Sequence, residues 1–497
     1  MTQHILSLDQ GTSSSRAIIY TAAGDVVSHA QQPFDMTFPS DGWVEQDPEV
    51  LWRTTYEVAT EAIREAGLST ADIAAIGITN QRETTLVWDK NTGECIYNAI
   101  VWQDRRTADR CEVMAGDQIE GVSVGEYISA HTGLLIDPYF SGTKLAWILD
   151  HVPGARERAK NGELAFGTVD TFLIWRLTEG RCHYTDASNA SRTQLYDIHA
   201  QCWNEPLLEY FDIPIEMLPE VKDNAGDLGE ATALGGPIPI TGAAGDQQAA
   251  LIGQACFAPG QVKSTYGTGC FVISNTGQEA ISSTQNLLTT IAYQLNGKVT
   301  YGLEGSIFVA GVAIKWLRDQ LNLIDDVSET SSAFRETGGD TNGVYVVPAF
   351  TGLGAPHWRP NVRGMISGLT LDSSRAQIIT AFLQSVCFQT QELLSAMSHD
   401  GATITEIRVD GGMVVNDDLC QFLADILGIK VVRPKDVETT ARGAAILAAL
   451  GAGIFADLDS VSSLWGVDRE FSVHMDEETR AALLEGYAKA VRLASAE

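Results

Sequence analysis

The sequence predicts an α/β protein built from two large domains of similar topology. Apolar strands alternate with amphipathic helices along the chain, which is the pattern of α/β folds. At 497 residues, the chain exceeds the size of one ordinary hydrophobic core. A strand, a turn containing Gly and Thr, and a second strand occur at 6–20 and again at 262–274. We interpret this repeat as an internal duplication whose two turns face one cleft. Two unrelated hairpins are the alternative, because Gly-Thr turns are common.

The composition indicates a folded protein with a strongly acidic surface. Hydrophobic residues make up 44% of the chain, and the formal net charge is −31. A nucleic-acid partner requires a basic footprint, and an acidic surface is repelled by anionic membranes, so both partners are disfavoured. The N-terminal residues lack the basic and apolar segments of a signal peptide, and the eight cysteines are scattered singly. We therefore expect a cytoplasmic protein with reduced core cysteines and no membrane insertion.

Local signals place the first helix and a ligand-binding strand end. Asp47 can cap a helix that has Pro48 in its first turn and Gly67 just after its end. The apolar segment 73–80 then predicts a buried strand, and it runs into the polar stretch “NQRE” at 80–83. Open α/β sheets bind ligands at the carboxyl ends of their strands, so this polar stretch is a candidate binding site.

The stretch “DQGTSSSR”, which begins at Asp9, is a candidate phosphate site. Small residues at a tight turn expose backbone N–H groups, and the hydroxyls of Thr12, Ser13 and Ser14 add further donors. Arg16 can neutralise additional charge, and Asp9 can hold Mg²⁺ directly or through water. The alternative is a polar hairpin loop without a ligand. The chain contains neither GxxxxGK[ST] nor GxGxxG, which disfavours a P-loop NTPase and a standard dinucleotide-binding domain.

Two further turns carry candidate functional residues. In “ITGAAGDQQAA”, a strand ends in small residues and Asp246 opens a helix, either as its N-cap or as a carboxylate that acts as a base or lies near a metal. In “EIRVDGGMVVNDD”, paired glycines let a flat ligand approach the backbone, and Asn416 follows as a helix cap or a ligand contact. The local pattern favours capping for Asn416. The helix at Asp246 is followed by the turn “CFAPG”, which indicates a domain boundary after residue 253.

These three sites together resemble the actin/hexokinase/Hsp70-like ATPase superfamily. Longer motifs narrow the resemblance to the FGGY family of carbohydrate kinases, and within it to members that phosphorylate glycerol. The resemblance extends from residue 5 to about residue 470, and it implies two actin-like (ribonuclease H-like) domains with an interdomain catalytic cleft. Residues 1–253 would bind glycerol and phosphate, and residues 254–497 the nucleotide. The motifs are “TNQRET” (79–84), “NAIVWQDRR” (98–106), “GLLIDPYFSGTK” (133–144), “YFSGTKLAWILDH” (139–151), “AGDQQAA” (244–250), “TYGTGCF” (265–271) and “PAFTGLGAPHW” (348–358).

The resemblance implies a transfer of phosphate from ATP to glycerol that yields sn-glycerol 3-phosphate, with Mg²⁺ as cofactor and a homodimer or homotetramer as the assembly. Asp246 matches the catalytic base and Asp9 the carboxylate that handles Mg²⁺. The glycerol-binding positions are Arg82, Glu83, Trp102, Tyr139, Asp246, Gln247 and Phe271. The nucleotide-binding positions are Thr12, Ser13, Ser14, Arg16, Thr268, Gly311, Gly412 and Asn416. Lys315 stands where such kinases often have Gln near the nucleotide, so it either alters nucleotide affinity or faces solvent.

Two other functions are compatible with parts of this pattern. A kinase for a pentulose or another polyol would share the fold and the mechanism, and pocket volume cannot be read from a sequence. An actin- or Hsp70-like ATPase would share the nucleotide site, but it would have no use for “NQRE”, Trp102 or “IDPYF”. From the residues alone, Trp102 and Phe271 are also compatible with an ordinary place in the core.

Overall fold

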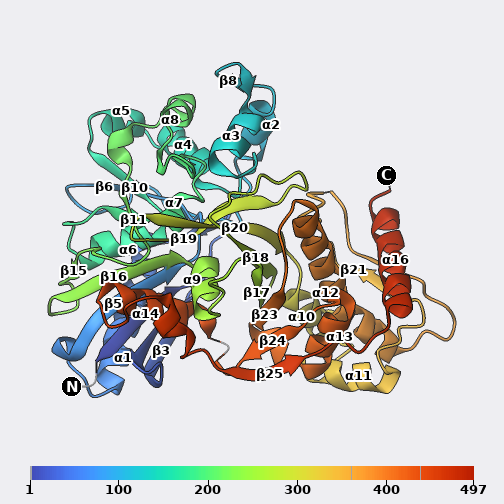
Figure 1. Cartoon of the computed structure of the whole chain (residues 1–497). Helices are drawn as coiled ribbons and strands as arrows, with labels where there is room; N and C mark the ends of the chain where they lie inside the picture. The colour runs from blue at the N-terminus through green and yellow to red at the C-terminus, as the bar shows by residue number, and fades with distance from the viewer. Residues whose placement is uncertain (1–2, 360, 437, 497) are drawn as a thin grey trace.

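Two mixed β-sheets form the framework of the computed structural model, which describes residues 3–359, 361–436 and 438–496 (Figure 1). The first sheet has the strand order β15 (Glu230–Ala231), β16 (Ile238–Gly245), β5 (Ile73–Asn80), β1 (His4–Gln10), β2 (Ser14–Thr21) and β3 (Val26–Pro33). The second has the order β19 (Leu288–Leu295), β20 (Lys298–Ile307), β18 (Cys270–Gly277), β17 (Gln261–Tyr266), β23 (Glu406–Asp410), β24 (Val431–Pro434) and β25 (Val467–Phe471).

Five strands of each sheet share one order and one set of directions, which confirms the internal duplication. In the first sheet, β1, β2 and β3 form an antiparallel meander, and β5 and β16 then add parallel to β1. In the second sheet, β17, β18 and β20 take the corresponding antiparallel places, with β19 inserted before β20 and paired with it at the sheet edge, and β23 and β24 add parallel to β17. Because the hairpins β1–β2 and β17–β18 occupy equivalent places, their turns lie at equivalent corners of the two domains.

Helices cover both faces of the first sheet, as the alternation of its side chains requires. Leu6 and Leu8 of β1 pack with α1 (Pro48–Glu65) and α6 (Val169–Leu177) on one face. Ile5 points to the other face and packs against α14 (Thr439–Gly451), which belongs to the second half of the chain. The strands of the first sheet therefore all precede residue 253, whereas one helix on that sheet follows it.

The helix α14 lies unusually close to its neighbours. A Cβ on Gly443 would be 1.7 Å from the carbonyl oxygen of Ala249 in α9 (Asp246–Gly253). The Ser7 hydroxyl of β1 donates to the Ala441 carbonyl at 2.7 Å, and Thr241 of β16 donates to the Ala448 carbonyl at 2.8 Å. These contacts fix α14 and α9 together beside the first sheet (Figure 1).

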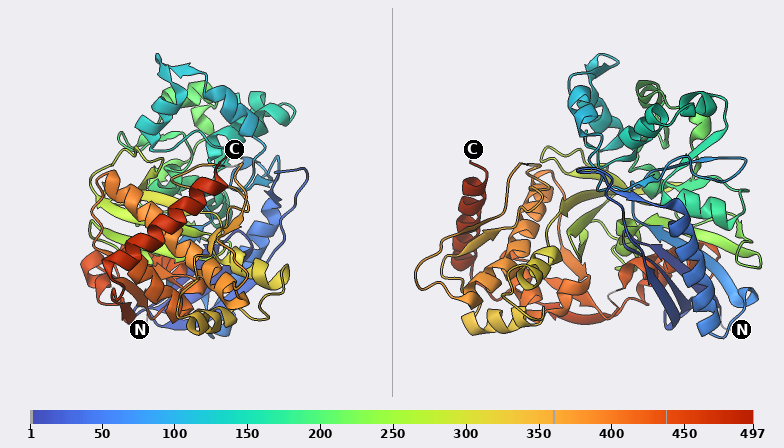
Figure 2. Two further views of the ribbon diagram at one scale, coloured as in Figure 1. Left: turned by 90° about the vertical axis from the view of Figure 1, so that its right-hand side faces the viewer. Right: turned by 180° about the vertical axis from the view of Figure 1, so that it is seen from behind.

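The remaining helices form a lobe on the first domain and the cover of the second sheet. The lobe, coloured cyan to green in Figure 1, has its own buried core. Figure 2 shows α16 on the outer side of the second domain, away from the first sheet. The lobe contains α2 (Ala108–Met114), α3 (Val124–Thr132), α4 (Ser141–His151), α5 (Ala155–Lys160) and α8 (Glu205–Phe211), near the short α7 (Ala187–Ala190). The second domain contains α10 (Gly311–Asp319), α11 (Glu329–Thr337), α12 (Arg375–His399), α13 (Asp417–Leu427), α15 (Leu458–Ser462) and α16 (Glu477–Ala494).

Short paired strands and single 3₁₀ turns complete the described structure. The pairs are β4 (Glu45–Gln46) with β7 (Ala99–Ile100), β6 (Leu86–Asp89) with β10 (Leu164–Gly167), β8 (Gln118–Ile119) with β9 (Val122–Ser123), β11 (Tyr184–Asp186) with β14 (Glu220–Lys222), β12 (Tyr196–Asp197) with β13 (Cys202–Trp203), and β21 (Tyr345–Val347) with β22 (Met365–Ser367). The 3₁₀ turns are η1 (Thr70–Asp72), η2 (Ile215–Met217) and η3 (Gly412–Val415).

The local sequence signals hold in the structure. Asp47 caps α1 by accepting a hydrogen bond from the Glu49 N–H at 2.9 Å, and Gly67 adopts a positive φ of 67° just after the helix. The strand β5 spans the predicted segment 73–80. All eight cysteines are unpaired, and five are buried as expected, whereas Cys202 is exposed. No helix among the described residues is long and apolar enough to cross a membrane.

Candidate active site

Each of the two Gly/Thr turns is closed by a hydrogen bond from a glycine N–H. In the β1–β2 turn, the Gly11 N–H donates to the Ser14 carbonyl at 2.9 Å, and in the β17–β18 turn the Gly267 N–H donates to the Gly269 carbonyl at 2.9 Å. The start of α10 is held on the second turn, where the Gly311 N–H donates to the Gly267 carbonyl at 2.9 Å. A Cβ on Gly311 would lie 2.6 Å from that carbonyl oxygen, so this close approach requires glycine. The structure thus brings Thr268 and Gly311 together.

The first turn is flanked by a buried carboxylate and by an arginine that pairs with two carboxylates. Asp9 and Arg16 are cross-strand partners, and their side chains form an ion pair of 2.8 Å. Arg16 also pairs with Glu438, which directly precedes α14, at 2.5 Å. Burial raises the pKa of Asp9 above its usual value, and the Arg16 charge partly opposes that effect. A cation near Asp9 would therefore favour its ionised form.

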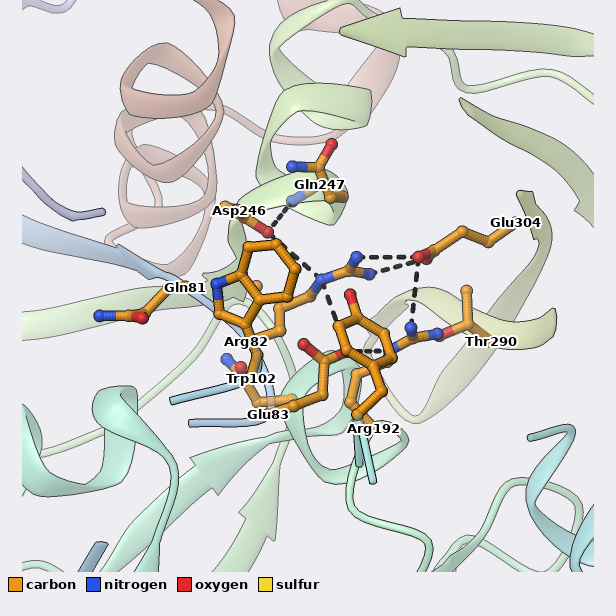
Figure 3. A network of polar contacts seen from close by, with 12 residues as sticks. Gln81, Arg82, Glu83, Trp102, Arg192, Asp246, Gln247, Thr290 and Glu304 are labelled. Atoms are coloured by element: carbon orange, nitrogen blue, oxygen red, sulfur yellow. Dashed lines mark hydrogen bonds and ion pairs between the residues drawn. The ribbon is translucent and has the colours of Figure 1, made fainter. Parts of the chain in front are cut away.

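Polar residues after β5 meet the start of α9. Arg82 is 3% exposed, and its Nε lies 3.3 Å from Oδ1 of Asp246 (Figure 3). Gly245 occupies the N-cap of α9, so Asp246 lies in the first turn and is not the cap. Its Oδ1 accepts the Gln247 N–H at 2.7 Å. Burial raises the pKa of Asp246, and the positive charges of Arg82 and Lys263 act in the opposite direction.

Glu83 adopts a backbone conformation that is rare for a residue with a side chain. Its φ is 60°, in the left-handed region. Its carbonyl oxygen accepts hydrogen bonds from Ser141 at 3.0 Å and from the buried Lys144 at 3.3 Å. Lys144 also donates to the Tyr139 carbonyl at 2.5 Å. Residues of the “YFSGTK” motif therefore hold the strained Glu83 in place.

Three aromatic rings form a wall beside these polar groups. The ring centroids of Trp102 and Tyr139 are 5.7 Å apart, and those of Trp102 and Phe271 are 6.3 Å apart, both with edge-to-face geometry. All three residues are only partly buried, which favours a surface-lining role over an ordinary core position. The Trp102 Nε1–H donates to the Thr12 hydroxyl at 3.0 Å. This bond ties the aromatic wall to the first Gly/Thr turn.

The second sheet adds two buried charges that the sequence did not reveal as site residues. Lys263 of β17 is fully buried and donates to the side-chain oxygen of Gln247. Glu304 of β20 accepts hydrogen bonds from both terminal nitrogens of the Arg82 guanidinium, at 2.7 and 2.8 Å. Arg192 contacts Glu83 at 2.6 Å and Glu304 at 3.2 Å (Figure 3). For Lys263 and Glu304, the available signal was a charged residue inside a strand, and both strands also contain other polar residues, whereas Arg192 carried no signal.

The paired glycines that the sequence offers to a flat ligand lead into η3 on the second domain. A Cβ on Gly412 would meet no atom within 4 Å, so the backbone there is open to a flat ligand. The Asn416 side chain caps α13 by accepting the Asp418 and Leu419 N–H groups at 3.0 and 3.1 Å, which confirms the capping interpretation. Lys315 is exposed on α10.

Matches to family models cover most of the chain. Residues 4–253 match the N-terminal domain, and residues 262–452 the C-terminal domain, of the FGGY family of carbohydrate kinases. The chain belongs to this family. It is 58% identical over 494 residues to glycerol kinase 1 of Pseudomonas aeruginosa and 56% identical over 493 residues to a glycerol kinase of Alteromonas mediterranea, with 99% of each chain covered in both cases. The structure of Plasmodium falciparum glycerol kinase with ADP superposes with a TM-score of 0.93 at 37% identity, covering 100% of this chain and 99% of that one.

The arrangement in this FGGY kinase suits a small molecule with several hydroxyl groups. Arg82, Glu83, Asp246 and Gln247 provide charged and amide groups of both hydrogen-bonding types, and the aromatic wall provides apolar contact for a carbon chain. Opposite charges within the group pair with one another, so they compensate each other.

Proposed function

We propose that this FGGY kinase transfers the γ-phosphoryl group of ATP to a terminal hydroxyl of glycerol, forming sn-glycerol 3-phosphate and ADP. The observation that carries the proposal is the contact between two parts of the site. The polyol-type group, which consists of the polar residues around Arg82 and Asp246, lies beside the aromatic wall. Trp102 of that wall donates a hydrogen bond to the Thr12 hydroxyl of the first Gly/Thr turn, which belongs to the nucleotide half-site. The high identity to glycerol kinases over the full chain supports the choice of glycerol.

Asp246 is the proposed base. Its carboxylate takes the proton from the terminal hydroxyl, the hydroxyl oxygen forms a bond to the γ-phosphorus, and the bond to the bridging oxygen breaks as ADP leaves. A carboxylate is a weak base, but the loose transition state of phosphoryl transfer requires proton removal only late in the reaction. The burial that raises the pKa of Asp246 makes it a stronger base than a free aspartate.

Specificity follows from hydrogen bonding to each hydroxyl. Arg82, Glu83, Gln247 and Tyr139 are the proposed partners of the hydroxyls, with Trp102 and Phe271 against the carbon atoms. An analogue that lacks one hydroxyl would leave a buried polar group without a partner, which costs binding free energy.

The nucleotide half-site combines the two turns with the open backbone at Gly412. Thr12, Ser13, Ser14 and Arg16 on the first turn, with Thr268 and Gly311 on the second, are the proposed phosphate contacts. Among the described residues, no three His, Cys, Asp or Glu side chains cluster as a metal cage. The carboxylate of Asp9 fits Mg²⁺, which binds through one or two carboxylates, water and substrate phosphates. Asp9 would hold it, and the bound ion would supply charge neutralisation to the phosphates.

The test is identification of the product. The protein is incubated with ATP, Mg²⁺ and glycerol, and the product is assayed with sn-glycerol-3-phosphate dehydrogenase, which distinguishes the enantiomers. We expect one sn-glycerol 3-phosphate for each ADP. ADP formation without this product would contradict the proposal. Light scattering separately tests the prediction of a homodimer or homotetramer.

A further inference from the structure

Glu304 links the second sheet to the polyol-type group of the first domain. It lies on β20, and its carboxylate accepts Nη1 and Nη2 of Arg82 in a bidentate pair of 2.7 and 2.8 Å (Figure 3). Such paired, parallel hydrogen bonds fix the plane of a guanidinium as well as its position. Glu304 is 1% exposed, so water does not compete for these bonds.

Glu304 supplies one of the two glutamate charges beside two buried arginines. The buried group contains two arginines, Arg82 and Arg192, and two glutamates, Glu83 and Glu304. Glu304 contacts both arginines, whereas Glu83 contacts Arg192 at 2.6 Å and lies 3.9 Å from Arg82. Burial raises the pKa of Glu304, but Arg192 and Arg82 together lower it to about 2, so Glu304 is ionised at neutral pH.

The bidentate pair also determines which part of Arg82 faces Asp246. Glu304 and Gln248 accept hydrogen bonds from three of the five N–H groups of the Arg82 guanidinium, and all three are on the terminal nitrogens. The Nε is the atom that approaches Asp246, at 3.3 Å. If the guanidinium were free to turn, its two terminal nitrogens could form a bidentate pair with Asp246 instead and occupy both carboxylate oxygens.

We propose that Glu304 is a positioning residue of the polyol site, which holds the Arg82 guanidinium so that Asp246 keeps one carboxylate oxygen free for the substrate hydroxyl. The inference rests on the proposed function, because it assigns Asp246 the role of base. It also implies that a residue of the second sheet completes a site whose other polar groups come largely from the first domain.

The proposal predicts a particular change in pH dependence. The charged groups that face Asp246 are Arg82, from the end of β5, and Lys263, from β17. Lys263 faces Glu304 as well, beside Arg82 and Arg192. Neutralising Glu304 leaves the positive charge near Asp246 less compensated, which favours ionised Asp246. The acid limb of kcat/KM for glycerol therefore moves to lower pH in a Glu304→Gln variant.

The experiment compares Glu304→Gln with a matched control, Glu406→Gln. Glu406 is also a second-sheet glutamate with an arginine partner, Arg408, at 2.6 Å, but it lies at the opposite end of β23 from the turn near Gly412. Steady-state kinetics are measured for glycerol and for ATP, with thermal unfolding of both variants. For Glu304→Gln we expect kcat/KM for glycerol to fall on the order of ten- to a hundred-fold, with KM for ATP within about two-fold of wild type. The control keeps wild-type kinetics.

A double variant separates positioning from charge balance. Glu304→Gln combined with Arg192→Gln removes one charge of each sign, which keeps the net charge of the wild-type group and is expected to recover thermal stability. Arg82 still lacks its bidentate partner, so the loss in kcat/KM for glycerol persists. Recovery of wild-type kinetics in the double variant would overturn the proposal, as would a Glu304→Gln variant with lowered stability but unchanged kinetics and pH profile. A wild type that prefers another polyol would refute the proposed substrate instead, and the same comparison is then made with that polyol.

Discussion

Replacing Asp246 with asparagine tests the proposed base with little change in shape. In the wild type, Asp246 accepts the Gln247 N–H at 2.7 Å and lies 3.3 Å from Arg82 Nε. The amide oxygen of Asn can still make both contacts. What the variant lacks is the capacity to accept a proton. General-base catalysis contributes on the order of 10²–10⁴-fold, so we expect kcat to fall by that factor, or about 3–5 kcal/mol in activation free energy.

Binding should be nearly unaffected, because the hydrogen-bonding groups around the polyol remain. The assay measures ADP release through a coupled reaction, and calorimetry measures glycerol affinity separately. Asp150→Asn is the matched control, since Asp150 lies on α4, is accessible to solvent and forms an ion pair with Arg156. Turnover of the Asp246 variant within a few-fold of wild type would refute the role of Asp246 as base. A large loss of glycerol affinity would show that its main contribution is to binding.

Four further predictions concern packing, the metal and pH. Gly443→Ala places a Cβ 1.7 Å from the Ala249 carbonyl oxygen, so we expect a loss of about 3 kcal/mol or more, read as a lower Tm; an unchanged Tm would contradict the close packing of α14. Asp9→Asn should raise the Mg²⁺ concentration needed for half-maximal activity about ten-fold, since the carboxylate is the proposed protein ligand, and an unaltered Mg²⁺ titration would exclude that role. The raised pKa of Asp246 places the acid limb of kcat/KM above the ordinary aspartate value near 4, and a limb at or below that value would contradict it. The pKa of Glu304 is lowered to about 2, so its ionised form stabilises the fold at pH values above the usual glutamate pKa. This contribution is lost as the pH falls from about 4.5 toward 2, and urea unfolding at several pH values measures the loss. A wild type whose stability depends on pH in the same way as that of Glu304→Gln would contradict this prediction.

Local signals in the sequence were sufficient for several elements. Asp47, Pro48 and Gly67 predict α1 because capping and helix termination depend on neighbouring residues. The apolar run of β5 and the polar residues after it predict a strand end that binds ligands. The Gly/Thr turns predict the duplication, because the same hairpin begins both sheets.

Contacts between distant segments could not be predicted in the same way. Glu304 and Arg82 are 222 residues apart, and nothing in either local sequence specifies the other as partner. The position of α14 on the first sheet depends on glycines whose close approach becomes visible only in three dimensions. The roles of the glycerol and nucleotide residues came from resemblance to a family, and the domain boundary at residue 253 stays a prediction.

The most direct test of the central claim is the acceptor dependence of ATP turnover. ADP release is measured with ATP and Mg²⁺ alone, and then with glycerol, erythritol, xylulose or ribulose. Strong stimulation by glycerol alone, with sn-glycerol 3-phosphate as product, is the predicted result. Preference for a pentulose or another polyol would keep the fold and mechanism but contradict the substrate. Equal ATP turnover without any acceptor would indicate an ATPase and contradict the proposed phosphoryl transfer.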